Sequence, residues 1–303
     1  MGMHIKTHSD LDAVGSRVLL EAGGSIISST SYRDYATIDA AAESFIKNKE
    51  YKSGDTLLFT DICPSQGTCE FLNEQKPTDL NLALLDHHKT RSWANKYSWA
   101  TIDITKCAAQ LVYETINPVV QAKYKEFVQA VAAWDLWILD SPQRQRGENL
   151  NNLLGFIGRE AFVNAFVADP NSDELPTLKE ITKFLVARRD RYVRQVIKEQ
   201  LESSNARLDG FGNVFKIIFA TDFISEIGHA VLDHPEAEDL KYVCVVNPVT
   251  NTCSLRSRDG ETDIGKIAAM CDGGGHHSAA GFPVPFKEHL TEMIFGILNK
   301  LNY

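Results

Sequence analysis

The sequence lacks the features of a membrane, secreted or disulfide-stabilised protein. No apolar run approaches the roughly twenty residues that a membrane-spanning helix needs. The amino-terminal MGMHIKTH enters a strand-like run without the apolar core of a signal peptide. The six cysteines are scattered and form no CxxC pair. We therefore expect reduced, structural thiols in a cytoplasmic protein, with no zinc site built from cysteine.

The sequence also lacks an excess of basic residues. It has 31 Lys and Arg against 40 Asp and Glu, for a net charge of −9. Proteins that hold long nucleic acid nonspecifically usually carry a basic surface. An acidic chain can still act on phosphates if metal ions and a few arginines make the pocket locally positive. We expect short or small substrates, with neither a membrane nor long duplex nucleic acid as a partner.

The length of 303 residues predicts two domains. In the first half, apolar strand-like runs alternate with helical patterns, which is typical of a parallel sheet built from βαβ units. The expected strands are 4–8, 24–30, 56–61 and 81–88, and the clearest expected helices are 13–23 and 38–50. The pattern from about residue 106 to 167 is mostly helical.

The second half of the sequence predicts a smaller α/β domain with a mixed sheet. A polar, proline-containing stretch at 169–176 indicates a linker, and a long charged helix follows it to about residue 208. Expected strands are 213–220, 241–247 and 252–258, and expected helices are 223–233, 263–271 and 286–300. We expect domain boundaries at 1–170, 171–209 (linker and connecting helix) and 210–303. The paired strands of the last domain offer an edge for a homodimer.

Acidic and histidine residues gather where three apolar runs of the first domain end. The positions are His8, Asp10 and Asp12, then Asp61, then Asp86, His87 and His88. The carboxyl ends of parallel strands form the ligand crevice of an open sheet, so these residues are expected to meet. A further acid, Asp135, ends the helical run KEFVQAVAAWD.

Carboxylates with imidazoles suit a hard-to-borderline divalent ion, with Mn²⁺ the first expectation and Mg²⁺ the alternative. The donors exceed what one octahedral ion needs, which indicates two ions and phosphoryl-transfer chemistry. Taken singly, each motif also has an ordinary explanation: Asp12 could cap the helix that follows it, and Asp61 could cap a turn. Four aspartates packed without cations would repel one another, so the conjunction favours a metal site.

The segments THSDLDAVGS, TDICPS, LLDHHKT and AAWD resemble, in order, the four motifs of the DHH phosphoesterase superfamily. The run GGGHHSAAGF at 273–282 resembles the glycine-rich signature of the accompanying DHHA1 domain. The resemblance spans nearly the whole chain and is greatest to the nano-RNase B-type oligoribonucleases, which trim very short RNAs. It implies a parallel-sheet DHH domain followed by a DHHA1 domain.

The resemblance also implies a role for each motif residue. His8, Asp10 and Asp61 would hold one ion, and Asp12, Asp61, His87 and Asp135 would hold the second, with Asp61 shared. Asp86 would orient a ligating imidazole, and His88 would face the scissile phosphate. A hydroxide bridging the ions would attack phosphorus in line.

In the second domain, the resemblance assigns substrate recognition to Arg256 and to Gly273, Gly274, Gly275 and His276. Glycine lets the backbone approach a phosphate closely, and the less favoured alternative is that GGG forms a helix end and turn. Arg258 is expected to be a solvated surface charge. Core packing is expected for Trp93, Trp99, Trp134 and Trp137, although an aromatic ring in the cleft could also stack on a base.

Two departures from the family pattern bear on the substrate. Ala13 stands where many members have glycine, and one residue separates His8 from Asp10 where the family II pyrophosphatases have a longer spacing. The main expectation is hydrolysis of short oligonucleotides to mononucleotides. The alternatives are a phosphatase for 3′-phosphoadenosine 5′-phosphate, a cyclic or linear dinucleotide phosphodiesterase, and a nucleotide-binding regulator without catalysis.

Overall fold

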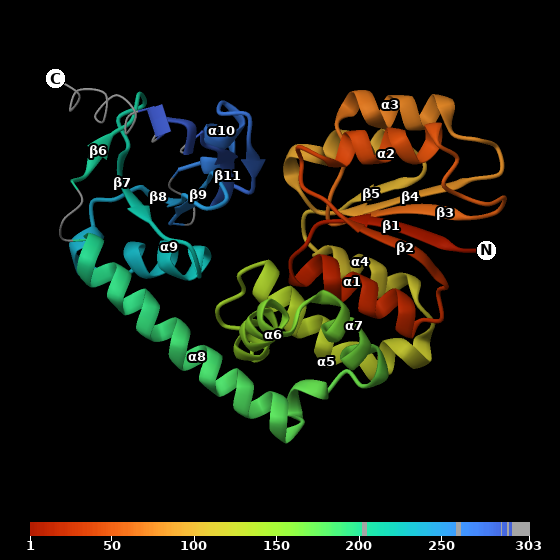
Figure 1. Cartoon of the computed structure of the whole chain (residues 1–303), viewed down its shortest axis with the longest axis horizontal. Coiled ribbons are helices and arrows are strands. Elements are labelled where there is room, and N and C mark those ends of the chain that lie inside the picture. Colours follow the sequence, from red (N-terminus) through yellow and green to blue (C-terminus); the bar gives the residue numbers. More distant parts are fainter. Residues whose placement is uncertain (202–204, 259–261, 286, 290, 293–303) are drawn as a thin grey trace. The chain divides into compact units, whose positions relative to one another are not determined.

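Five parallel strands form the sheet of the N-terminal unit, in the order β2-β1-β3-β4-β5. They are β1 (Met3–Thr7), β2 (Ile27–Tyr32), β3 (Thr56–Thr60), β4 (Asn81–Asp86) and β5 (Ala100–Ile102). The computed structural model describes residues 1–201, 205–258, 262–285, 287–289 and 291–292. Contacts divide the chain into two units, Met1–Val186 and Ala187–Tyr303. The predicted α/β fold is confirmed in this first unit (Figure 1).

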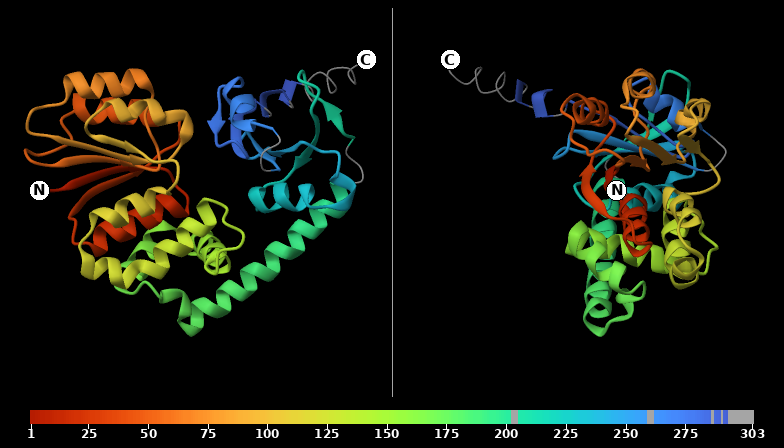
Figure 2. Two further views of the ribbon diagram at one scale, coloured as in Figure 1. Left: turned by 180° about the vertical axis from the view of Figure 1, so that it is seen from behind. Right: turned by 90° about the vertical axis from the view of Figure 1, so that its right-hand side faces the viewer.

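Helices cover both faces of this sheet, as the views in Figure 2 show. One face carries α1 (Leu11–Ala22), α4 (Ala108–Thr115), α5 (Pro118–Asp135), α6 (Arg144–Ile157) and α7 (Arg159–Ala168). The other carries α2 (Ile38–Lys47), α3 (Gln66–Gln75) and the 3₁₀ segment η1 (Lys89–Lys96). Successive strand residues serve opposite faces: Leu58 joins the first hydrophobic cluster, while Leu57 and Phe59 join the second. Burial on both faces explains the continuous apolar runs of the strands.

A short 3₁₀ turn, η2 (Ser172–Glu174), precedes the long helix α8 (Pro176–Val196), which runs across the boundary between the units. A π-helical turn, η3 (Ile197–Leu201), follows it directly.

Within the described residues, no helix is both long and apolar enough to cross a membrane. Five of the six cysteines are buried and all are free thiols, while the cytoplasmic location stays a prediction.

The second unit has a six-stranded sheet in the order β10-β11-β9-β8-β7-β6. The strands are β6 (Arg207–Leu208), β7 (Val214–Phe219), β8 (Tyr242–Asn247), β9 (Thr252–Ser257), β10 (Gly274–Gly275) and β11 (Ala279–Pro283). Only the β7–β8 pair is parallel, so the predicted mixed sheet is confirmed. Helix α9 (Ile224–Leu232) and the turn η4 (Pro235–Ala237) pack with Val243 and Val245, whereas α10 (Ile264–Ala269) packs with Tyr242 and Cys244.

The structure corrects several predicted element bounds. Strand β2 runs to Tyr32 rather than ending at residue 30, and the long helix does not reach residue 208, because Arg207 and Leu208 pair with β7. Strands β5, β10 and β11 were not predicted, since their short, mixed segments carry no alternation long enough to read. Much of the helix expected at 286–300 lies outside the described residues. The homodimer stays a prediction.

Candidate metal-binding active site

The site is built at the carboxyl edge of the first sheet. Strand β1 ends at Thr7 and is followed by His8, and β3 ends at Thr60 and is followed by Asp61. Asp86 is the last residue of β4, directly before His87 and His88. Because the three strands are neighbours in the sheet, residues distant in sequence reach one edge.

The first group of potential ligands is His8, Asp10 and Asp61, whose ligand atoms lie within 4.8 Å of one another. The Nδ1 atom of His8 lies 2.7 Å from Oδ2 of Asp10 and 3.9 Å from Oδ2 of Asp61. The side chains of His8 and Asp10 remain partly exposed at 39% and 42%, while that of Asp61 is 2% exposed. The group therefore has a buried floor and an open side.

The second group is Asp12, His87 and Asp135. The Nε2 atom of His87 lies 3.7 Å from Oδ2 of Asp12 and 3.4 Å from Oδ2 of Asp135. Helix α5 ends at Asp135 and thereby delivers its carboxylate to this group. These three residues belong to three elements that are far apart in the sequence.

Asp61 joins the two groups. Its Oδ1 lies 3.2 Å from Nε2 of His87, while its Oδ2 faces His8. The backbone of Asp61 has a left-handed φ of 56°, and its N–H donates to the carbonyl of Leu85 at 3.0 Å. Such a backbone is unusual for a residue other than glycine and commonly marks a functional site. A carboxylate at this point could be shared by two cations.

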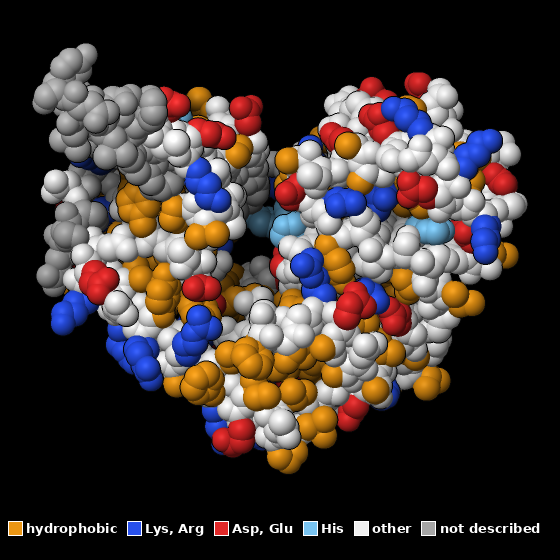
Figure 3. All heavy atoms as spheres, viewed as in Figure 1, with side chains coloured by type: hydrophobic (Ala, Val, Ile, Leu, Met, Phe, Trp, Pro, Cys, Tyr) orange, Lys and Arg blue, Asp and Glu red, His pale blue; other side chains and the backbone are white. Residues whose placement is uncertain are grey.

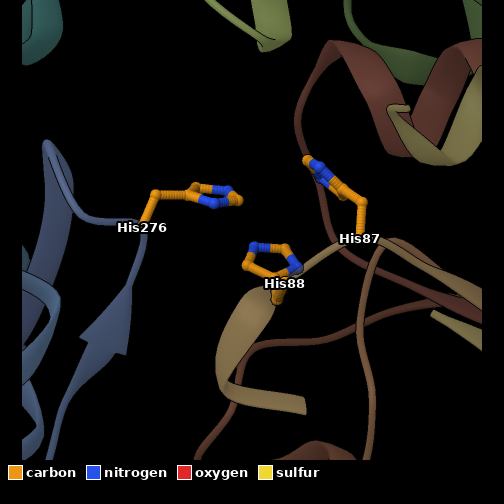
Figure 4. Close-up of side chains that lie close together, drawn as sticks. All are labelled: His87, His88 and His276. Carbon is orange, nitrogen blue, oxygen red and sulfur yellow. The ribbon is translucent and has the colours of Figure 1, made fainter. Parts of the chain in front are cut away.

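Asp86 contacts the two histidines that follow it in different ways. Its Oδ1 accepts the backbone N–H of His87 at 2.8 Å and lies 2.7 Å from Nδ1 of His88. The sequence predicted that Asp86 orients a metal-ligating ring, but the ring that it holds is that of His88, because the His87 ring points to Asp12, Asp61 and Asp135. Figure 4 shows His87 and His88 side by side, and their ring centroids lie 4.8 Å apart.

The structure decides which aspartate of the first motif caps the following helix. Asp10 is the N-cap of α1, and its Oδ1 accepts the N–H of Ala13 at 3.1 Å. Asp12 lies inside the first turn and accepts the N–H groups of Ala108 and Ala109 at 2.7 and 2.8 Å, at the start of α4. The interpretation of Asp12 as the helix cap is therefore wrong. Its buried charge instead meets the positive end of α4.

The carboxylates strongly perturb one another's pKa. Burial, followed by the charges of Asp10, Asp12 and Asp135, raises the pKa of Asp61 well above its usual value. Burial and the neighbouring carboxylates likewise raise the pKa of Asp135. In contrast, the charge of Asp10 raises the pKa of His8 to about 9. Although burial opposes it, His88 holds the pKa of Asp86 down at about 2.

These residues fit divalent cations. Oδ2 of Asp61 and Oδ2 of Asp135 are buried and have no hydrogen-bond partner among the described residues. Buried carboxylate oxygens of this kind are usually paired or coordinate a metal. Oxygen and imidazole donors without a thiolate suit Mn²⁺ or Mg²⁺. Positive charge between the two groups would also relieve the repulsion that raises the pKa of Asp61.

The predicted substrate residues of the second unit lie around β9 and the β10–β11 hairpin. Nη2 of Arg256 donates to Oγ of Ser225 at 2.6 Å, and burial lowers the pKa of this guanidinium to about 10. Arg256 pairs in register with Ala279, whose carbonyl accepts the N–H of His276 at 2.7 Å. The structure therefore brings Arg256 and the backbone of His276 to neighbouring positions; Figure 4 shows His276 on the hairpin turn.

The three consecutive glycines are not equivalent. A Cβ on Gly273 would lie 2.0 Å from the carbonyl oxygen of Gly281, and one on Gly275 would lie 2.5 Å from Cα of Ala280. The close packing of the hairpin therefore already requires these two glycines. A Cβ on Gly274 would have nothing within 4 Å. Of the three, Gly274 is the position where an added side chain would meet open space.

The prediction that Arg258 is a solvated surface charge is wrong. Its guanidinium donates to the carbonyls of Leu232, Ala237, Glu238 and Leu240, and so connects the end of α9 and the turn η4 to the end of β9.

The tryptophans have mainly packing roles. Trp93 and Trp99 pack against one hydrophobic cluster and Trp134 against the other. The ring of Trp137 lies 3.8 Å from the guanidinium carbon of Arg144.

Two residues near the site were not predicted from the sequence. The ring of Tyr35, in the loop after β2, lies 5.9 Å from the His88 ring in an edge-to-face arrangement. The guanidinium of Arg91, on η1, lies 4.8 Å from the Tyr35 ring centroid. A basic residue so soon after the two histidines was a usable signal for Arg91. The loop position of Tyr35 gave none.

No protein-family model matches the chain. The chain is 23% identical over 294 residues to the oligoribonuclease NrnB of Bacillus subtilis (strain 168), covering 92% of this chain and 72% of that protein. Together with the five motifs and the assembled carboxylate–histidine cluster, this similarity supports the resemblance of the chain to the DHH/DHHA1 phosphoesterase superfamily.

A solved structure agrees with the DHH/DHHA1 fold. The DHH domain of a member of a family of ribosomal proteins aligns with a TM-score of 0.61 at 13% identity, covering 99% of this chain and 86% of that one. A pGpG-specific phosphodiesterase, PggH of Vibrio, aligns with a TM-score of 0.49 at 15% identity and covers 99% of both chains.

Proposed function

We propose that this protein is a DHH/DHHA1-type phosphoesterase that hydrolyses the phosphodiester bonds of short oligoribonucleotides and releases mononucleotides. The observation that carries the proposal is the complete carboxylate–histidine cluster in a chain similar along most of its length to an oligoribonuclease. A regulator without catalysis would have no need for four crowded aspartates, three of which raise the pKa of the fourth, Asp61.

We assign the ligands of the two ions as the geometry groups them. His8, Asp10 and Asp61 would hold one ion, and Asp12, His87 and Asp135 would hold the other, with Asp61 shared. Mn²⁺ is the expected ion and Mg²⁺ the alternative. Divalent cations bound there would activate water for attack on phosphorus and neutralise charge on the phosphate.

His88 is the residue that we place against the scissile phosphate. Oδ1 of Asp86 lies 2.7 Å from Nδ1 of His88, and this contact fixes the orientation of the ring. A fixed donor is worth more in phosphoryl transfer than a mobile one, since no reorganisation is needed as charge develops. Asp86 therefore acts through His88, as a positioning residue.

The second domain supplies the residues that would recognise the rest of the substrate. Arg256 offers a guanidinium, and Gly274 and His276 lie on the β10–β11 hairpin, whose strand β11 pairs with β9. Backbone and guanidinium donors together suit a terminal phosphate of a nucleotide. We assign these residues to substrate binding, with Gly273 and Gly275 serving the packing of the hairpin.

The surface of the first unit is in keeping with a short substrate. On the face drawn in Figure 3, Lys and Arg side chains are interspersed with Asp and Glu, and the described residues there form no continuous basic band. Long strands are usually held by such a band. A net charge of −9 points the same way.

The test is a substrate panel with Mn²⁺, resolved by chromatography. The panel contains RNA and DNA oligonucleotides that range in length from dinucleotides to long strands. It also contains 3′-phosphoadenosine 5′-phosphate, a cyclic dinucleotide and pyrophosphate. Rapid conversion of RNA dinucleotides to mononucleotides, abolished by Asp61→Asn and kept by Asp79→Asn, is expected. Asp79 is a matched control, an exposed aspartate of the same domain in the loop before β4.

Other outcomes of the panel would contradict the substrate or the class. Preference for the bisphosphate or the cyclic dinucleotide would keep the metal chemistry and replace the substrate. Equal turnover with and without chelator would contradict the metal site. No turnover of any substrate would favour a nucleotide-binding regulator.

A further inference from the structure

Among the described residues of the first unit, Arg91 is the arginine with a buried guanidinium nitrogen that has no hydrogen-bond partner. Arg17 pairs with Glu21 and Glu160, and Arg146 pairs with Asp173. The guanidinium of Arg91, in contrast, makes no hydrogen bond or ion pair within the described chain, and its Nε is buried without a partner. Leaving such a donor unpaired costs about 1–3 kcal/mol, so the residue calls for a ligand that accepts hydrogen bonds.

Arg91 is nevertheless held firmly in place. Its backbone N–H donates to the carbonyl of His88 at 2.8 Å, and its guanidinium lies over the ring of Tyr35, with the guanidinium carbon 4.8 Å from the centroid. Stacking on an aromatic face fixes the plane of a guanidinium and leaves its edge free for hydrogen bonds. A flat, fixed edge of this kind matches two oxygens of a phosphate.

The position of Arg91 indicates which phosphate it would meet. Tyr35 contacts the His88 ring edge-to-face and the Arg91 guanidinium through its own face. The guanidinium is thus one aromatic ring removed from the imidazole that faces the scissile phosphate. Tyr35 keeps 38% of its surface exposed, so a substrate can reach the pair.

We propose that Arg91, positioned by Tyr35, binds a phosphate group of the substrate next to the scissile one. This inference rests on the proposed function and adds to it. The DHH domain would then hold two phosphates, one at the metal ligands and one at Arg91. Tyr35 is a positioning residue for this subsite, because its ring contacts the guanidinium.

The experiment compares three RNA dinucleotides: one without a terminal phosphate, one with a 5′-phosphate and one with a 3′-phosphate. In Arg91→Ala, kcat/KM for a phosphorylated dinucleotide should fall by roughly tenfold to a hundredfold, mainly through KM, since charge-assisted hydrogen bonds are worth about 1.5–3 kcal/mol. The dinucleotide without a terminal phosphate should be nearly unaffected. Equal loss on all three substrates, or loss in kcat alone, would overturn the proposal.

The variants at Tyr35 and a matched arginine sharpen this result. Tyr35→Phe keeps the ring and should behave like the wild type. Tyr35→Ala should lower kcat/KM for the same substrates as Arg91→Ala does, but by a smaller factor. Arg159, whose guanidinium lies 4.5 Å from the ring of Tyr32, offers a similar stacked pair in the same domain. Arg159→Ala should leave all three dinucleotides unchanged, and a loss like that of Arg91→Ala would count against a specific subsite.

A binding measurement separates this inference from the proposed function. Calorimetry with Mn²⁺ would compare adenosine 5′-monophosphate with adenosine for the wild type and Arg91→Ala. Weaker binding of the monophosphate alone supports the subsite even if the wild type cleaves no dinucleotide, in which case only the substrate assignment fails. A wild type that cleaves dinucleotides, with Arg91→Ala indistinguishable in both assays, would overturn the subsite.

Discussion

Strands β1 and β3 carry a histidine and an aspartate at each of their two ends. At one end the aspartate is satisfied by hydrogen bonds, and at the other it is not. At the amino end, His4 lies in β1 and Asp55 directly precedes β3; at the carboxyl end, His8 follows β1 and Asp61 follows β3. Asp55 accepts the N–H groups of Gly2 and Lys52 at 2.6 and 2.9 Å and lies 3.2 Å from Nε2 of His4. The amino-end pair is thus satisfied by the protein itself.

The carboxyl end leaves its charges without such partners. Oδ2 of Asp61 has no hydrogen-bond partner among the described residues, and burial together with the surrounding carboxylates raises the pKa of Asp61. The pKa of Asp55, in contrast, is lowered to about 2. Within this pair, the carboxylate that the protein itself satisfies has a lowered pKa, and the one left among other carboxylates has a raised pKa. Residue type alone does not make this distinction.

The largest expected effect is on catalysis: substitution of Asp61 should lower activity strongly, whereas substitution of Asp55 should not. Asp61→Asn should lower kcat/KM for RNA dinucleotides by roughly a thousandfold or more, because loss of a shared ligand removes several kcal/mol of transition-state stabilisation. Asp55→Asn should retain activity within about threefold at neutral pH, since Asp55 lies at the opposite end of the strand. Similar losses in both variants, measured on folded protein, would break the comparison.

The next effect is stabilisation by the metal. Addition of Mn²⁺ to chelator-treated protein should raise the thermal midpoint, and a hundredfold excess over Kd corresponds to about 2.7 kcal/mol. Asp55→Asn should respond as the wild type does, whereas Asp61→Asn should respond much less. Without metal, Asp61→Asn should be no less stable than the wild type, because it removes a charge from a repulsive cluster. Scanning fluorimetry with and without chelator measures both expectations.

Much of the fold and of the candidate site could be predicted from the sequence, because the sequence pattern indicates where the strands end. The runs before His8, Asp61 and Asp86 are apolar on both faces of a parallel sheet, and such sheets gather their polar residues at one edge. The α/β fold and the mixed second sheet followed from these runs, and the family resemblance followed from the motif order. The grouping of the cluster around Asp61 was expected from the resemblance, and the geometry supports it.

The rest depended on contacts that no local pattern encodes. Whether Asp10 or Asp12 caps α1 was settled by the N–H groups of Ala108, nearly a hundred residues away. Arg256 lies on β9 and Arg258 directly follows it, and only the tertiary structure shows that Arg258 donates to four carbonyls. The role of Tyr35 depends on packing against His88 in the same way.

A smaller effect tests whether Arg144 positions Asp135, a member of the second group of potential metal ligands. Nη1 of Arg144 donates to the carbonyls of Ala133 and Trp134 at 3.1 Å each, at the end of α5 next to Asp135. Arg144→Ala should weaken the apparent affinity for Mn²⁺ by roughly tenfold, as loss of groups that orient a ligand commonly does. Arg146→Ala, on the same helix, removes an ion pair to Asp173 and should change stability without changing the metal titration. Equal metal titrations for the two variants would contradict a positioning role for Arg144.

The smallest expected effect is a pH-dependent difference in stability at the amino end. The N–H groups of Gly2 and Lys52 are the main cause of the lowered pKa of Asp55, which is about 2. A carboxylate with a depressed folded-state pKa stabilises the protein fully above its unfolded value of about 3.9, and this contribution disappears as the pH falls through the folded-state pKa. The difference in denaturation midpoint between the wild type and Asp55→Asn should therefore be greatest above about pH 4 and should shrink toward about pH 2. Urea titrations over this range measure it; a difference that stays constant with pH would mean that Asp55 acts through shape and not through its charge.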